Sequence, residues 1–105
     1  MNQPDADRPW DSTFLVERYW PGVDEAQLRI DLQKLDEAAL RMRAEGQLVQ
    51  HLFTILMPTD QVVFTLIAAA SEAAVRELNA RVDMPIDRVA RAIQLMPDRV
   101  LEVKR

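Results

Sequence analysis

Residues 24–46 read DEAQLRIDLQKLDEAALRMRAEG, and this stretch decides the fold. Asp24 can cap a helix, and Gln27 three residues later completes a capping-box arrangement. Gly46 supplies the left-handed residue that commonly ends a helix. The stretch therefore predicts one amphipathic helix, about 21 residues and on the order of 30 Å long. Its buried stripe is expected to consist of Leu28, Leu32, Leu35, Ala39 and Met42.

Strand-forming segments flank this helix on both sides. Residues 13–20 are β-branched and aromatic, and Pro21-Gly22 stops them, which predicts a strand followed by a turn. Residues 48–56 and 62–69 predict two further strands joined by a short turn. The helix is thus expected to connect the first strand to a hairpin.

A second helix follows, and the last element is ambiguous. Ser71 can cap a helix that ends near Asp83, a residue that tolerates the left-handed region. Residues 87–96 favour a helix by propensity and show the alternation of a strand only in part. If they form a strand, the order is that of the α+β, ferredoxin-like βαββαβ fold, with an antiparallel sheet and two helices on one face.

Length and composition exclude several classes of protein. The chain has 105 residues, a net charge of -4 and no cysteine, so it has no disulfide framework and no thiolate metal site. The acidic balance argues against nucleic acid or an anionic membrane as a partner. No long apolar stretch or signal peptide is present, which predicts a cytoplasmic protein. The length predicts one domain at 13–96, between a flexible N-terminal arm at 1–12 and a C-terminal tail at 97–105.

The two middle strands are apolar on both faces. Strict alternation along residues 48–56 would place on one face Val49, His51, Phe53 and Ile55. It would place on the other face Leu48, Gln50, Leu52, Thr54 and Leu56. Two helices can cover only one side of a sheet, so we expect the second face to pack against another copy in a homodimer. The alternative is a monomer whose open face is kept tolerable by polar side chains such as Gln50 and Thr65.

Three short stretches resemble a family of small bacterial proteins that are nickel-binding and similar to nickel-responsive regulators. They are TFLVER at 13–18, EAAVREL at 72–78 and MPIDRV at 84–89. The family, often described only as a domain of unknown function, has a ferredoxin-like fold. The resemblance implies a dimeric α/β barrel with a cavity and a strand after Pro85, so we interpret residues 87–96 as a strand. It also implies nickel as a candidate metal, although this chain has Thr65 near the family's cysteine and alanines 68–70 in place of its Glu-Ala-Pro.

His51 and Glu17 are the candidates for chemistry. His51 is the only histidine, and it could act as a general base, a metal ligand or a hydrogen-bonding group. The alternative is a buried histidine whose hydrogen bonds are simply satisfied. Glu17 could transfer protons in a cavity, or it could pair with Arg18, Arg88 or Arg91. In a ferredoxin-like sheet the two residues would lie roughly 10 Å apart and could flank one ligand.

Two functions follow from these candidates. The first is a homodimeric binding protein for a metal ion or a small apolar ligand, with His51 and Glu17 as metal ligands. The ligand-binding residues would be Tyr19, His51, Thr54 and Thr65. Tyr19 has an alternative role in aromatic packing against the long helix. The second function, by fold analogy, is a cofactor-free dimeric α/β-barrel oxygenase, cyclase or isomerase that uses His51 and Glu17 as acid and base.

Overall fold

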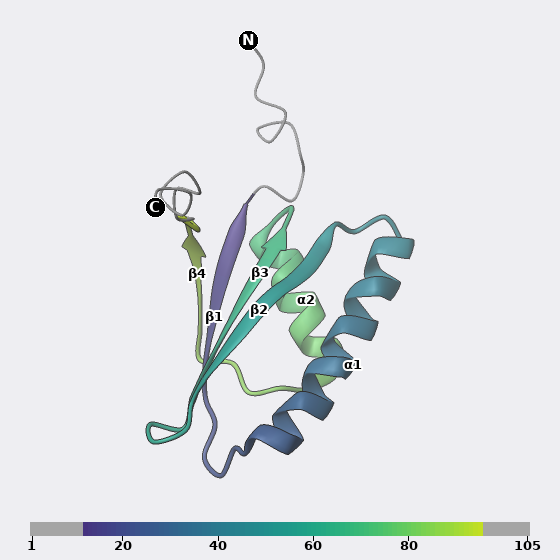
Figure 1. Ribbon diagram of the computed structural model, residues 1–105. Coiled ribbons are helices and arrows are strands. Elements are labelled where there is room, and N and C mark those ends of the chain that lie inside the picture. Colours follow the sequence, from purple (N-terminus) through teal and green to yellow (C-terminus); the bar gives the residue numbers. More distant parts are fainter. Residues whose placement is uncertain (1–11, 96–105) are drawn as a thin grey trace, which may run out of the picture.

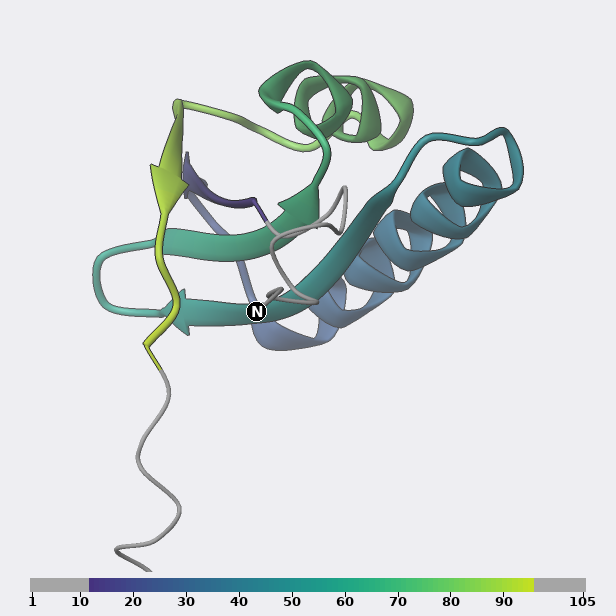
Figure 2. The ribbon, with the colours of Figure 1, turned by 90° about the horizontal axis from the view of Figure 1, so that it is seen from above.

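A computed structural model describes residues 12–95. Its elements are β1 (Thr13–Tyr19), α1 (Glu25–Ala44), β2 (Val49–Met57), β3 (Val62–Ala69), α2 (Glu72–Val82) and β4 (Arg88–Ala92). The strands form one antiparallel sheet in the order β2-β3-β1-β4, and both helices lie on the same face (Figures 1 and 2). The expected ferredoxin-like βαββαβ fold is confirmed. The tail at 97–105 and all of the arm except Ser12 lie outside the described residues, as does Met96.

Both helices begin and end at the residues that the sequence indicates. The Asp24 carboxylate accepts a hydrogen bond from the Gln27 backbone N–H at 2.8 Å, and the Ser71 hydroxyl accepts one from the Ala74 N–H at 3.2 Å. Gly46 has a φ of 92° just beyond α1, and Asp83 has a φ of 58° at the end of α2. These local signals set the limits of each helix, and so they set where the polypeptide passes between the helix layer and the sheet.

β4 forms although its residues favour a helix. It pairs antiparallel with β1 along a register that runs from Thr13↔Ala92 to Glu17↔Arg88. Without β4, the backbone groups along this side of β1 would have no strand partner, and tertiary pairing of this kind commonly overrides propensity. The strand is shorter than the segment 87–96 predicted for it.

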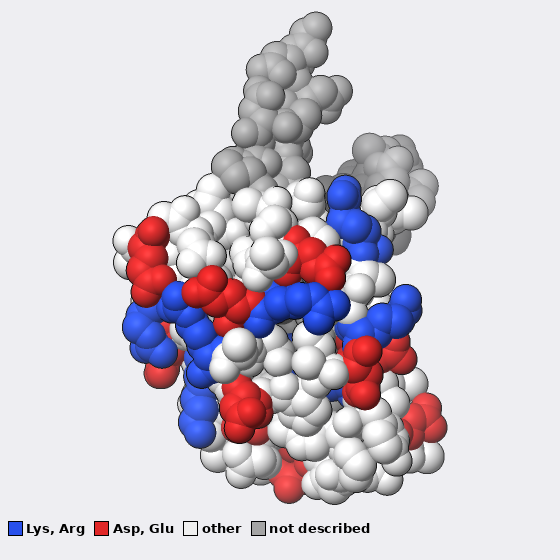
Figure 3. All heavy atoms as spheres, turned by 180° about the vertical axis from the view of Figure 1, so that it is seen from behind, with Lys and Arg blue, Asp and Glu red and all other residues white. Residues whose placement is uncertain are grey.

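The core lies between the helices and the sheet. The predicted α1 stripe is confirmed, with Leu32 the one partly buried member. The core's fully buried members include Val16, Leu35, Met42, Val63, Val75 and Leu78. Within residues 12–95, no helix is both long enough and apolar enough to cross a membrane. Seen from behind, the surface carries positive and negative side chains close together (Figure 3).

A β-bulge interrupts β2. His51 pairs with Ile67 and Phe53 pairs with Leu66, so Leu52 is an extra residue on this strand. The strict alternation expected for residues 48–56 is therefore wrong. His51 and Thr54, expected on opposite faces, both lie on the helix-covered face, where they contact each other.

Phe53 and Ile55, expected beside His51, lie on the opposite, uncovered face. Neighbouring strands place further side chains on this face, which we call the open face. Its exposed large apolar residues are Tyr19, Phe53, Ile55 and Met57. Each is 41–56% exposed, so the open face is both apolar and accessible in one chain.

Candidate functional site

His51 is held between a carboxylate and a hydroxyl. Its Nδ1 lies 2.8 Å from Asp36 Oδ1 on α1, and its Nε2 lies 2.7 Å from Thr54 Oγ1 on β2. In the neutral imidazole, Nδ1–H donates to the carboxylate, because an ionised carboxylate can only accept. Nε2 then accepts a hydrogen bond from the Thr54 hydroxyl. The result is a continuous row of hydrogen bonds from carboxylate to imidazole to hydroxyl between α1 and β2.

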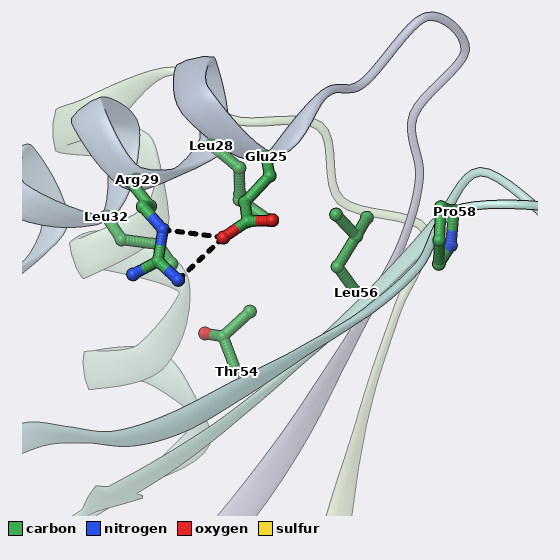
Figure 4. Close-up of a pocket in the computed structure, with 7 residues that line it drawn as sticks. All are labelled: Glu25, Leu28, Arg29, Leu32, Thr54, Leu56 and Pro58. Atoms are coloured by element: carbon green, nitrogen blue, oxygen red, sulfur yellow. Dashed lines mark hydrogen bonds and ion pairs between the residues drawn. The ribbon is translucent and has the colours of Figure 1, made fainter.

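The side chains of Asp36, His51 and Thr54 lie in a surface groove between α1 and β2, which we call the α1–β2 groove. The groove has two hollows. The first measures about 330 Å³ and is lined by Glu25, Leu28, Arg29, Leu32, Thr54, Leu56 and Pro58 (Figure 4). The second measures about 350 Å³ and is lined by Asp36, Ala39, Arg43, Gln50, His51 and Leu52. Thr54 lines the first hollow and His51 lines the second, so the hydrogen bond between them lies between the two hollows.

The first hollow combines an apolar wall with three polar side chains, those of Glu25, Arg29 and Thr54. Leucine side chains from α1 and Leu56 from β2 form the wall, and Thr54 Oγ1 is its uncharged side-chain polar atom. Arg29 donates from Nε at 2.9 Å and from Nη2 at 2.6 Å to Glu25 Oε2. Figure 4 shows this ion pair and Thr54 around the same space. Arg29 has five N–H donors, so three remain for a ligand.

The predicted site residues do not all come together. His51 and Thr54 meet in the groove, whereas Glu17 and Tyr19 lie on the open face. Glu17 Oε1 accepts a hydrogen bond from Arg88 Nε at 3.1 Å, one of the ion pairs expected as an alternative. The expectation that Glu17 and His51 flank one ligand is wrong within one chain, because the sheet separates them.

Thr65 lies on the helix-covered face but lines neither hollow. It is completely buried, and its hydroxyl accepts a hydrogen bond from Arg18 Nε at 3.2 Å. Its side chain therefore contributes to packing between β1 and β3, and it does not reach the groove.

The donor set does not fit a nickel ion in a single chain. Among residues 12–95, no three histidine, cysteine, aspartate or glutamate side chains gather where they could hold a metal. Both ring nitrogens of His51 already have partners, and Glu17 lies beyond the sheet. First-row metals usually need several converging nitrogen, oxygen or sulfur ligands.

Asp36 is the site residue that the sequence analysis missed. It belongs to an acidic pair on α1, and such pairs usually form a solvated helix face. Its carboxylate is indeed 60% exposed, yet one oxygen is bonded to His51. The available signal was its place beside the apolar stripe, four residues after Leu32 and three before Ala39, which directs it to the border of the sheet.

Topology places the chain in the class of ferredoxin-like α+β proteins. Its structure is similar to the crystal structure of SCO4226 from Streptomyces coelicolor A3(2), with a TM-score of 0.64. The match covers 80% of this chain and 99% of that chain, and the two sequences are 19% identical, so the likeness concerns the fold alone. No protein-family model matches this sequence, and no curated protein matches it in sequence.

Proposed function

We propose that this protein is a homodimer that binds a small organic ligand in the α1–β2 groove. The observation that carries the proposal is the His51–Thr54 pair, held by Asp36 at the side of an apolar hollow. Small-molecule sites are usually concave and mainly apolar, with a few fixed polar groups that orient the ligand. The first hollow has an apolar wall of three leucines and Pro58, and its polar groups are Thr54 and the Glu25–Arg29 ion pair.

The lining indicates the chemistry of the ligand. The leucines of the first hollow suit a hydrocarbon or aromatic body. The N–H groups of Arg29 that do not bind Glu25 suit a carbonyl or carboxylate oxygen. A small carbonyl compound with an apolar body matches both features, and it matches them better than a bare metal ion, because the metal-binding candidates do not converge.

The open face supports the homodimer. It presents four large apolar side chains, and its charged pair, Glu17 and Arg88, neutralises itself within one chain. Two copies of such a face therefore meet without net charge repulsion, and their association removes apolar surface from water. The groove lies on the other side of the sheet and remains accessible in such a dimer.

Ligand binding can be tested by NMR titration of the ¹⁵N-labelled protein with 4-phenylbutan-2-one, an apolar ring with one carbonyl. We expect saturable shifts in residues that line the first hollow, namely Leu28, Arg29, Leu32, Thr54 and Leu56. Arg29→Gln should weaken binding several-fold. Arg76→Gln is the matched control, because Arg76 forms the same kind of exposed ion pair four residues apart on α2. Shifts confined to other parts of the sheet, or equal effects of both variants, would contradict the proposal.

Catalysis without a cofactor is a second candidate function, favoured by one observation. The expected acid/base pair of His51 and Glu17 is divided by the sheet, but Asp36 bonds to His51 instead. An imidazole oriented by a carboxylate is a common general base. The catalytic hypothesis therefore continues with Asp36 in place of Glu17.

A further inference from the structure

We propose that Thr54 is a nucleophile, activated by His51 and oriented by Asp36, and that the α1–β2 groove hydrolyses small acyl esters. The inference rests on the proposed function, since the ester must bind in the first hollow. It adds a reaction, a nucleophile and a substrate class to that site.

Three side chains have the mutual geometry that nucleophilic catalysis needs. Thr54 Oγ1 is 2.7 Å from His51 Nε2, and His51 Nδ1 is 2.8 Å from Asp36 Oδ1. An activated hydroxyl is recognised by a base within hydrogen-bond reach and a third group that orients the base. Asp36 sets the tautomer in which Nε2 is free to take the hydroxyl proton.

The β-bulge builds this arrangement. Residues three apart on a regular strand point to opposite faces, so His51 and Thr54 could not meet without the extra residue Leu52. Leu52 itself buries only part of its apolar side chain at this position, because it is 36% exposed. Bulges occur often beside active sites, where they redirect a side chain. Here the redirected side chains are those of the base and the hydroxyl.

The two hollows supply the remaining parts of the reaction. The apolar wall of the first hollow can hold the acyl chain beside Thr54. Arg29 lines the same hollow, and its N–H groups outside the ion pair with Glu25 can donate to the oxygen that becomes negative in the tetrahedral intermediate. The second hollow, lined by His51 and Gln50, gives water access to the base.

The reaction balances with water as the only co-reactant. Thr54 Oγ attacks the ester carbonyl carbon, and its proton passes to His51 Nε2. The bond from that carbon to the leaving oxygen then breaks, and the alcohol departs with the proton from His51. Water, deprotonated by His51, attacks the acyl-Thr54 ester, and His51 returns the proton to Thr54 Oγ. One ester and one water give one acid and one alcohol.

The test uses the full chain and 4-nitrophenyl butyrate. We expect release of 4-nitrophenol above the background rate and a transient mass increase of one butyryl group, located at Thr54 by peptide mapping. The β-branched threonine hinders the attack of water on its own ester, so the acyl form should accumulate. Butyryl groups found only on lysine or the N-terminal amine would overturn the proposal.

Variants assign the roles. Thr54→Val should abolish both acylation and turnover. Thr54→Ser should retain both, because serine keeps the hydroxyl and lacks only the methyl group. His51→Gln should slow acylation about 100-fold, and Asp36→Asn should also slow it strongly. The matched controls are Thr59→Val, at an exposed turn, and Glu37→Gln, exposed beside Asp36; both should leave the rate unchanged. A rate that needs His51 but survives Thr54→Val would make His51 the nucleophile and overturn the proposal.

A separate titration distinguishes failure of the chemistry from failure of the site. If 4-phenylbutan-2-one shifts Leu28, Arg29, Leu32, Thr54 and Leu56 while 4-nitrophenyl butyrate neither acylates nor turns over, the groove binds ligands and this inference is wrong. If neither compound engages the groove, both the inference and the proposed function are wrong.

Discussion

Arg18 shows how strongly one residue can depend on its surroundings. It is completely buried, and its guanidinium partners among residues 12–95 are neutral: Nε donates to Thr65, and Nη1 donates to Asn79 and to the Pro85 carbonyl oxygen at 2.8 Å. Nη2 has no partner. Burial lowers the pKa of the Arg18 guanidinium to about 10. The side chain nevertheless joins β1, β3, α2 and the segment before β4 through a planar fork that only arginine offers.

We therefore expect Arg18→Lys to lower the free energy of unfolding by about 1–3 kcal/mol, because a single ammonium leaves buried acceptors such as Asn79 Oδ1 without a donor. Urea denaturation measures the change. Arg76→Lys is the matched control, since Arg76 forms an exposed pair with Glu72 on α2, away from the open face, and should change stability by no more than about 0.5 kcal/mol. Equal stability of the two variants would show that the buried fork is dispensable.

At the same scale, the sequence predicted part of the site. His51 and Thr54 were identified as candidates by residue type, and they meet in the groove. Their partnership was not predicted, because the bulge at Leu52 has no glycine or proline to mark it and depends on pairing with β3. Glu17 is expected beside His51 from the spacing of the strands alone, which does not say which face of the sheet each side chain takes. Alternation of side chains along a strand cannot assign residues to the two faces of the sheet once a bulge has broken that alternation.

A helix or strand can be predicted from local sequence where a side chain forms a hydrogen bond to nearby backbone. The capping residues and the apolar stripe are local signals, and they predicted the limits of α1. β4 could not be obtained in this way, because its strand geometry comes from pairing with β1, more than seventy residues earlier in the chain. Propensity describes only the segment itself, and it favoured a helix there.

The cap at the start of α1 gives a prediction for that element. Asp24→Ala removes the acceptor that the Gln27 N–H uses at 2.8 Å, and it should lower the free energy of unfolding by about 1 kcal/mol. Thermal melts or urea titration would record the loss. Glu37→Ala, in the middle of the same helix and exposed, should leave stability unchanged or raise it slightly. An unchanged midpoint in Asp24→Ala would mean that the cap does not help to hold α1.

Packing of α1 against α2 is expected to depend on pH through Arg81. Its Nη2 bonds to Glu45 Oε1 at 2.7 Å, at the end of α1, and to Glu77 Oε2 at 2.6 Å on α2. The hydrogen bond from Arg81 lowers the pKa of Glu45. A carboxylate with a depressed pKa stabilises the fold above its unfolded pKa, and that contribution is lost as the pH falls through its folded pKa.

Arg81→Gln should therefore lower the thermal midpoint slightly at neutral pH, and the difference from the unsubstituted protein should shrink once the pH is below about 4. The pair is exposed, so the effect should also shrink in high salt. Thermal melts at several pH values measure it. A difference that is constant with pH would indicate a packing effect of the long side chain instead.

In the whole molecule, the sheet divides two tasks between its faces. One face, covered by the helices, holds the core and borders the groove with Asp36, His51 and Thr54. The other is covered by neither α1 nor α2, and it presents a row of exposed apolar side chains from β1 and β2. Except at the bulge in β2, side chains alternate between the two faces along each strand, so a substitution on the open face can change association without altering the groove.

This division makes the homodimer testable with a matched pair of variants. Ile55 on the open face and Ile30 on the outer side of α1 are nearly equally exposed, at 48% and 49%. Sedimentation velocity at micromolar concentration should give a dimer for the unsubstituted protein and for Ile30→Glu. It should give a monomer for Ile55→Glu, because the change buries an unpaired carboxylate at an apolar interface. Ile55→Glu should still bind 4-phenylbutan-2-one, since the groove lies on the opposite face. A monomeric unsubstituted protein, or dissociation by both variants alike, would mean that the open face is not where two copies meet.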